Sequence, residues 1–100
     1  MKQFSLQLML LLFLVTSIQA QNALESGDIA YGARNFKQAI SYYERALNEQ
    51  PNNLDLQLKL AHSYRFVNDM LNAEKMYASA CLAPSTDAIN YYYYGTCLLY

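Results

Sequence analysis

The sequence has few of the residues that enzymes use for chemistry. It contains one histidine, His62, two cysteines and three glycines in 100 residues. No serine or cysteine nucleophile motif lies beside the histidine, and no glycine-rich phosphate loop is present. One histidine and two distant cysteines also lack the spacing of a zinc site. We therefore expect no catalysis, no bound metal and no cofactor.

An excess of charge is also lacking. Seven basic residues stand against eight acidic ones, which gives a formal net charge of −1. A chain of this length forms at most one small domain. Because proteins that bind nucleic acid need a clear positive footprint, we expect no nucleic-acid partner.

Long apolar runs are missing except at the N-terminus. Residues 6–15 are nearly all Leu, Met, Phe and Val, they follow Lys2, and the small residue Ala20 comes shortly after them. This pattern predicts a signal peptide over residues 1–20, cleaved after Ala20. A membrane-spanning helix needs about 20 apolar residues, and polar residues such as Gln7 and Thr16 interrupt this run. We expect a periplasmic, cell-envelope-associated or secreted protein with no stable membrane span after cleavage.

Small residues recur at a fixed step. A period of 34 residues links Gly27 to Ala61 and Gly95, Ala39 to Ala73, and Ala46 to Ala80. Tyr43 and Tyr77 keep the same step. A period of this length in a helical sequence predicts a stack of two-helix hairpins.

Apolar residues three and four apart predict where the helices lie. The expected ranges are 22–33, 36–49, 54–67 and 70–82, with a last helix from about residue 87. Asn35 and Asn53 are expected to cap the second and third helices. Gly27 is expected where a neighbouring helix approaches closely, since glycine inside a helix costs about 1 kcal/mol.

The residues at the repeating positions are mostly small or aromatic, and they are Gly27, Phe36, Ala39, Tyr43, Ala46, Leu47 and Pro51, then Leu60, Ala61, Tyr64, Ala73, Tyr77 and Ala80, then Tyr91, Tyr94 and Gly95. They resemble the signature of the tetratricopeptide repeat (TPR). The resemblance implies an all-α, right-handed solenoid of antiparallel helix hairpins over residues 21–100, with units at about 20–53 and 54–87 and an incomplete unit at 88–100. Gln21, which would follow the cleavage point, resembles exported proteins of the Bacteroidetes group.

The resemblance also implies a function. In this family the first helices of successive units line a concave groove that binds a peptide or a partner's helix, and the matching residues here are Asp28, Tyr31, Leu58, His62, Arg65, Phe66, Tyr92 and Thr96. We expect a protein partner, held mainly by aromatic side chains and Arg65. The lysine and asparagine clamp of some relatives is not expected, because Asp28 has the wrong charge. The alternative is an N-terminal scaffold of a larger cell-envelope protein whose activity lies downstream.

The last helix carries four consecutive tyrosines, which point in four directions on a helix. We expect Tyr91 and Tyr94 to pack inside the unit, while Tyr92 and Tyr93 stay partly exposed. The apolar C-terminal end would be open, and we expect it to pair with a second copy if nothing else covers it.

The two cysteines leave two alternatives. By the packing of the family, Cys81 and Cys97 occupy facing stripes of successive helices. An exported protein could join them in a disulfide. Alternatively, both are free thiols that act as small apolar side chains.

Overall fold

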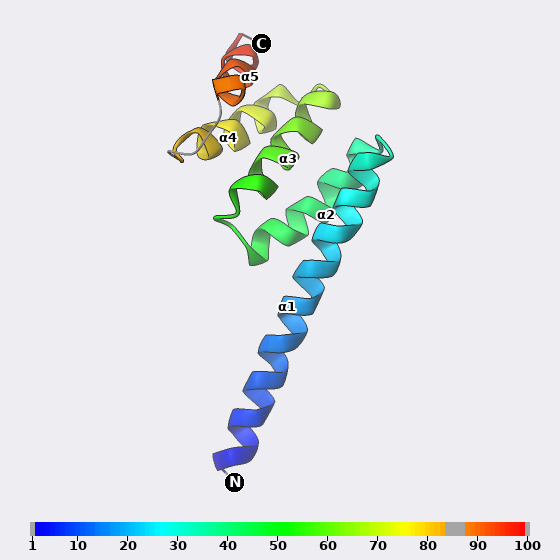
Figure 1. Ribbon diagram of the computed structural model, residues 1–100, viewed down its shortest axis with the longest axis vertical. Helices are drawn as coiled ribbons and strands as arrows, with labels where there is room; N and C mark the ends of the chain where they lie inside the picture. The colour runs from blue at the N-terminus through cyan, green and yellow to red at the C-terminus, as the bar shows by residue number, and fades with distance from the viewer. Residues whose placement is uncertain (1, 84–87, 100) are drawn as a thin grey trace.

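The computed structural model describes residues 2–83 and 88–99, and the secondary structure of this part is all helical (Figure 1). The helices are α1 (Lys2–Gly32), α2 (Phe36–Glu49), α3 (Leu54–Phe66), α4 (Met70–Cys81) and α5 (Ala88–Leu98). Each helix packs on the one before it. Two hairpins, α1–α2 and α3–α4, are thus followed by α5, in the order that the repeat predicts. The expected start of the last helix near residue 87 lies outside the described residues.

Side-chain caps fix the starts of three helices. The Oδ1 atom of Asn35 accepts a hydrogen bond from the backbone N–H of Gln38 at 3.4 Å, and Asn53 accepts one from Leu56 at 3.1 Å. Asp69 caps α4 in the same way. Such a cap satisfies one of the backbone donors that a helix start leaves unpaired. The predicted capping roles of Asn35 and Asn53 are confirmed.

The turn inside each hairpin repeats with the same geometry. Arg34 and Asn68 both have a left-handed backbone, with φ of 60° and 63°. The N–H groups of the residues that follow them, Asn35 and Asp69, each donate to the carbonyl five residues back at 2.9 Å. This conformation costs non-glycine residues some energy, so its recurrence one period later shows that the hairpin is one structural unit used twice.

Helix α1 begins much earlier than the predicted first helix. It runs without a break from Lys2 through Ala20 to Gly32, because no proline or glycine interrupts its first 25 residues. The side chains of residues 6–12 that the structure describes are exposed. No helix in the described part of the chain is long and apolar enough to cross a membrane. Helical backbone at Ala20 neither requires nor prevents cleavage, so the signal peptide stays a prediction.

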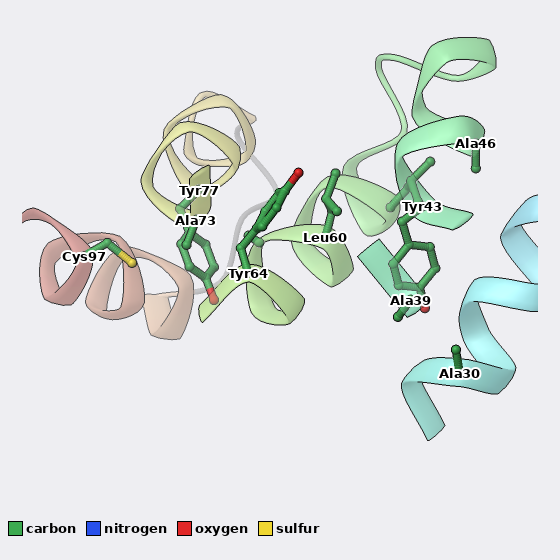
Figure 2. Packing of buried hydrophobic residues seen from close by; sticks show 11 residues of the cluster. Ala30, Ala39, Tyr43, Ala46, Leu60, Tyr64, Ala73, Tyr77 and Cys97 are labelled. Carbon is green, nitrogen blue, oxygen red and sulfur yellow. The ribbon is translucent and has the colours of Figure 1, made fainter. Parts of the chain in front are cut away.

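The core is built from small residues and large rings at equivalent positions (Figure 2). Each second helix buries one tyrosine between two alanines, and all six side chains have no exposed surface: Ala39, Tyr43 and Ala46 in α2, and Ala73, Tyr77 and Ala80 in α4. The alanines let neighbouring helices approach, and the tyrosine rings fill the space between them.

Gly27 makes the closest approach in this core. A Cβ atom placed on Gly27 would lie 2.6 Å from two carbons of the Tyr43 ring, Cδ1 and Cε1. Gly95 occupies the equivalent position in α5, and a Cβ atom there would meet nothing within 4 Å. The predicted packing role of Gly27 is therefore confirmed, and it does not extend to Gly95.

The different surroundings of Gly27 and Gly95 predict different effects of alanine at the two positions. Gly27→Ala should lower the free energy of unfolding by about 1–3 kcal/mol, because the new methyl group overpacks the core. Gly95→Ala should leave it unchanged or raise it by up to about 1 kcal/mol, since alanine is the better helix former. Urea unfolding followed by circular dichroism measures both. Equal effects of the two substitutions would contradict the packing.

Candidate functional site

The eight groove residues lie on the first helices of the units, as expected: two on α1, four on α3 and two on α5. All eight are half-buried or exposed, so the structure places them on a surface and not in the core. The contacts among them and their neighbours differ between the two junctions where one hairpin meets the next.

At the first junction, the carboxylate of Asp28 has two partners within the chain. The hydroxyl of Tyr43 donates to Asp28 Oδ1 at 2.6 Å, and Lys59 Nζ lies 3.0 Å from the same oxygen. Lys59 also lies 3.2 Å from Asp55 Oδ2. Burial of the Tyr43 ring and its hydrogen bond to Asp28 raise the pKa of that hydroxyl far above its usual value. Asp28 thus ties α1 to α2 and α3.

The second junction repeats this arrangement with other side chains. One period after Asp28, Tyr43 and Lys59 come His62, Tyr77 and Tyr93. The Tyr77 hydroxyl is hydrogen-bonded to His62 Nδ1, and the Tyr93 ring centroid lies 5.5 Å from that of His62. A polar group on the first helix, a tyrosine on the second and a side chain on the next first helix therefore meet at both junctions.

Arg65 adds a fourth group to this contact. Its Nε donates to the Tyr77 hydroxyl oxygen at 3.3 Å. The hydroxyl hydrogen is then free to point at His62 Nδ1, which accepts it only when that nitrogen carries no proton. Burial and the nearby charge of Arg65 lower the pKa of His62. Both effects favour the neutral imidazole.

Around Arg65 the aromatic side chains form a continuous line. The guanidinium carbon lies 4.6 Å from the ring centroid of Phe66 and 4.2 Å from that of Tyr93. Phe66 stacks on Phe36 at 4.4 Å, and Tyr93 meets Tyr92 edge-on at 5.7 Å. We call these five residues the groove strip. It joins the start of α2 to α3 and α5.

No protein-family model and no curated protein matches the sequence. Among solved structures, the chain is similar to the crystal structure of MamA protein, a TPR-type protein, with a TM-score of 0.73 and 25% sequence identity. The fold is a TPR-like helical-repeat solenoid. The match covers 81% of this chain and 44% of that protein, so the chain spans less than half of its length.

In this TPR-like fold, Tyr92 and Tyr93 are partly exposed, as predicted, but the role expected for Tyr91 needs correction. Tyr91 was expected inside the unit, but 52% of it is exposed, and its hydroxyl donates to the carbonyl of Cys81 at 2.9 Å. Tyr93 was missing from the expected groove residues, although its ring contacts both Arg65 and His62. Tyr94 is half-buried against the core, as predicted. The physical reason is the rotation of α5, which turns position 93 toward α3.

The repeat contained a signal for Tyr93. Lys59 precedes it by 34 residues, just as Asp28 precedes His62. A side chain that reaches back from position 59 to position 28 predicts one that reaches from position 93 to position 62. The remaining groove residues lie beside these contacts: Tyr31 packs edge-on against Phe36, Leu58 packs on the core, and Thr96 donates to the carbonyl of Tyr92.

Both cysteines are free thiols in the structure. Cys97 is buried with its Sγ atom 4.0 Å from Met70 Sδ, and Cys81 is half-buried. Burial raises the pKa of both thiols, which disfavours the reactive thiolate. A disulfide between them stays a prediction. In the described residues, no three His, Cys, Asp or Glu side chains lie together so as to hold a metal ion.

The lowered pKa of His62 predicts how the free energy of unfolding depends on pH. Because its pKa is lower in the folded chain than the unfolded value of about 6.5, the unfolded chain binds a proton that the folded chain does not. The stabilising contribution of His62 to the free energy of unfolding is therefore complete above about pH 7. It decreases as the pH falls through about 6.5 toward the pKa of His62 in the folded chain. Urea unfolding of the wild type and of His62→Gln between about pH 7.5 and pH 5.5 measures this. Identical pH dependence in the two proteins would contradict the assignment.

Proposed function

We propose that the chain is a protein-binding module that holds an extended peptide or a helix of a partner protein in the groove lined by α1, α3 and α5. The groove strip carries this proposal. It exposes 45% of Phe66 and 67% of Tyr92, while contacts with neighbouring side chains hold Arg65 and Tyr93 in place. Tyrosine and arginine are enriched among the residues that dominate binding energy in interfaces. A surface that is already ordered loses less entropy on binding.

The proposal includes export and a non-enzymatic role. The apolar run of residues 6–15 and the small residue at position 20 support export. N-terminal sequencing of the mature protein, with Gln21 as the expected first residue, checks it. Holding a partner on a preformed surface needs no cofactor and no catalytic group, which agrees with the poor supply of such groups in the sequence.

An alternative proposal rests on the surface of α5. Here the chain would serve as a scaffold segment that stacks its C-terminal end on another helical unit, either a second copy or part of a larger cell-envelope protein. Ile89 is 52% exposed, Leu98 56% and Leu99 87%. Solenoids bury such faces against the next unit, so these side chains support the stacking alternative.

Peptide selection separates the two proposals. Peptides selected from a random phage library on the immobilised full chain should lose at least about tenfold in affinity on Tyr92→Ala, as for a residue central to an interface. They should bind the Leu71→Ala variant normally. Leu71 is similarly exposed, at 65%, but it lies on the second helix α4 and not on a first helix. Loss on Leu99→Ala instead, with a dimer in sedimentation, would favour stacking. Failure to select any peptide that depends on Tyr92 would contradict groove binding.

A further inference from the structure

Helix α5 packs on α4, and its ring contacts with α3 come from one side chain, Tyr93. The Tyr93 ring centroid lies 4.2 Å from the guanidinium carbon of Arg65 and 5.5 Å from the ring centroid of His62. The ring also stacks on that of Tyr77 in α4, with the centroids 6.1 Å apart. The place of Tyr93, and of the α5 end of the groove strip, therefore depends on how His62, Arg65 and Tyr77 are arranged.

The hydrogen bonds among these three side chains are complete only with a neutral imidazole. The hydroxyl oxygen of Tyr77 accepts from Arg65 Nε, and its hydrogen can then point at His62 Nδ1. In a protonated histidine both ring nitrogens are donors. The oxygen could accept from both side chains, but its own hydrogen would have no acceptor among the described residues, in a side chain with no exposed surface. A buried donor without a partner opposes folding.

Protonation also places two positive charges together without compensation. Arg65 follows His62 by less than one helical turn, and burial and the charge of Arg65 lower the pKa of His62. The carboxylates on the helices that pack against α3 are engaged elsewhere: Glu44 of α2 is bonded to Tyr64, and Glu74 of α4 acts on Cys97. Helix α5 carries no charged residue. Within the described residues, nothing therefore offsets a charge on His62.

The first junction has the same arrangement without this sensitivity. Asp28 takes the place of His62 there, and it is bonded to both Tyr43 and Lys59. His62 is the only histidine in the sequence. Between about pH 5 and pH 7.5, where histidine side chains titrate, a change confined to the second junction can thus be assigned to His62.

We propose that His62 makes the attachment of α5 sensitive to pH: the neutral imidazole holds Tyr93 against α3, and protonation releases it. The contact is complete above about pH 7 and is lost as the pH falls through about 6.5 toward the pKa of His62 in the folded chain. Its consequence for the groove rests on the proposed function. Because Tyr92 and Tyr93 form the α5 end of the groove strip, a partner should bind less tightly as the pH falls.

Amide hydrogen exchange of the full chain, followed by NMR, tests the contact without any ligand. Protection factors correct the measured rates for the intrinsic effect of pH, and the imidazole signals of His62 report its protonation in the same samples. Between about pH 7.5 and pH 5, the protection of the α5 amides should fall at least about fivefold, because the Tyr77 hydroxyl loses its acceptor. The fall should follow the titration of His62, and the amides of α2 should change less.

Two variants separate the contact from a general effect of acid. His62→Gln keeps an acceptor for the Tyr77 hydroxyl but does not titrate, so the protection of α5 should stay level over the same range. Tyr93→Leu removes the ring that meets His62 and Arg65. In this variant α5 should be weakly protected at every pH, with no further loss as His62 titrates. Circular dichroism verifies that both variants remain folded.

Three results would each overturn the inference. They are level protection of α5 while His62 titrates in the wild type, equal losses in α2 and α5, and an unchanged pH dependence in His62→Gln. The first two need only the wild type, so the test does not depend on the folding of a variant. Failure to select a groove peptide would contradict the proposed function and leave the pH-sensitive contact standing.

Discussion

The hydroxyl groups of Tyr43 and Tyr77 are the contacts on which the arrangement of the helices depends. Each ring is fully buried in a second helix, and each hydroxyl reaches a polar group on the preceding first helix, Asp28 or His62. A buried hydroxyl without a partner would oppose folding. The tyrosine therefore stabilises the stack only when the helices are in the register that the structure shows. Hydrophobic burial favours many helix arrangements, and this pair of hydrogen bonds selects one.

The same position in the repeat gives two surfaces with different chemistry. Asp28 is matched by Lys59, so the first junction is a closed electrostatic contact. At the second junction the imidazole of His62 and the Tyr93 ring occupy those places, and Arg65 donates to the Tyr77 hydroxyl from the side. A cation surrounded by rings, without a counter-charge among the described residues, suits recognition of a partner. The repeat thus determines how the three helices meet at each junction. Different residues at equivalent positions give the second junction the chemistry of the proposed site.

Much of the fold could be predicted because local physics determines it. The bounds of α2 follow from the Asn35 cap and a clear apolar stripe, and they agree with the structure at both ends. The alanine positions of the core follow from their period. The orientation of α5 could not be predicted in this way, since four consecutive tyrosines have no apolar side to reveal which face is buried. Contacts with α4 and α3 decide it, which is why the part played by Tyr93 was missed.

The predicted extent of α1 was wrong for a different reason, since the residues assigned to a signal peptide also form helix in the intact chain. For the candidate site, the sequence placed the eight residues on the first helices, where the structure has them. It did not show that Asp28 is engaged by other side chains or that Tyr77 joins His62 to Arg65. Those facts depend on side-chain contacts between helices.

Unfolding of tyrosine-to-phenylalanine variants in urea tests the central claim most directly. Tyr77→Phe should lose about 1–3 kcal/mol, because it leaves His62 and Arg65 without their shared partner. Tyr43→Phe should lose about 1 kcal/mol or somewhat less, since Asp28 keeps Lys59. Tyr92→Phe, whose side chain is exposed, should stay within about 0.5 kcal/mol of the wild type. If Tyr43→Phe and Tyr77→Phe were as stable as Tyr92→Phe, the hydroxyl groups would not hold the helices in register.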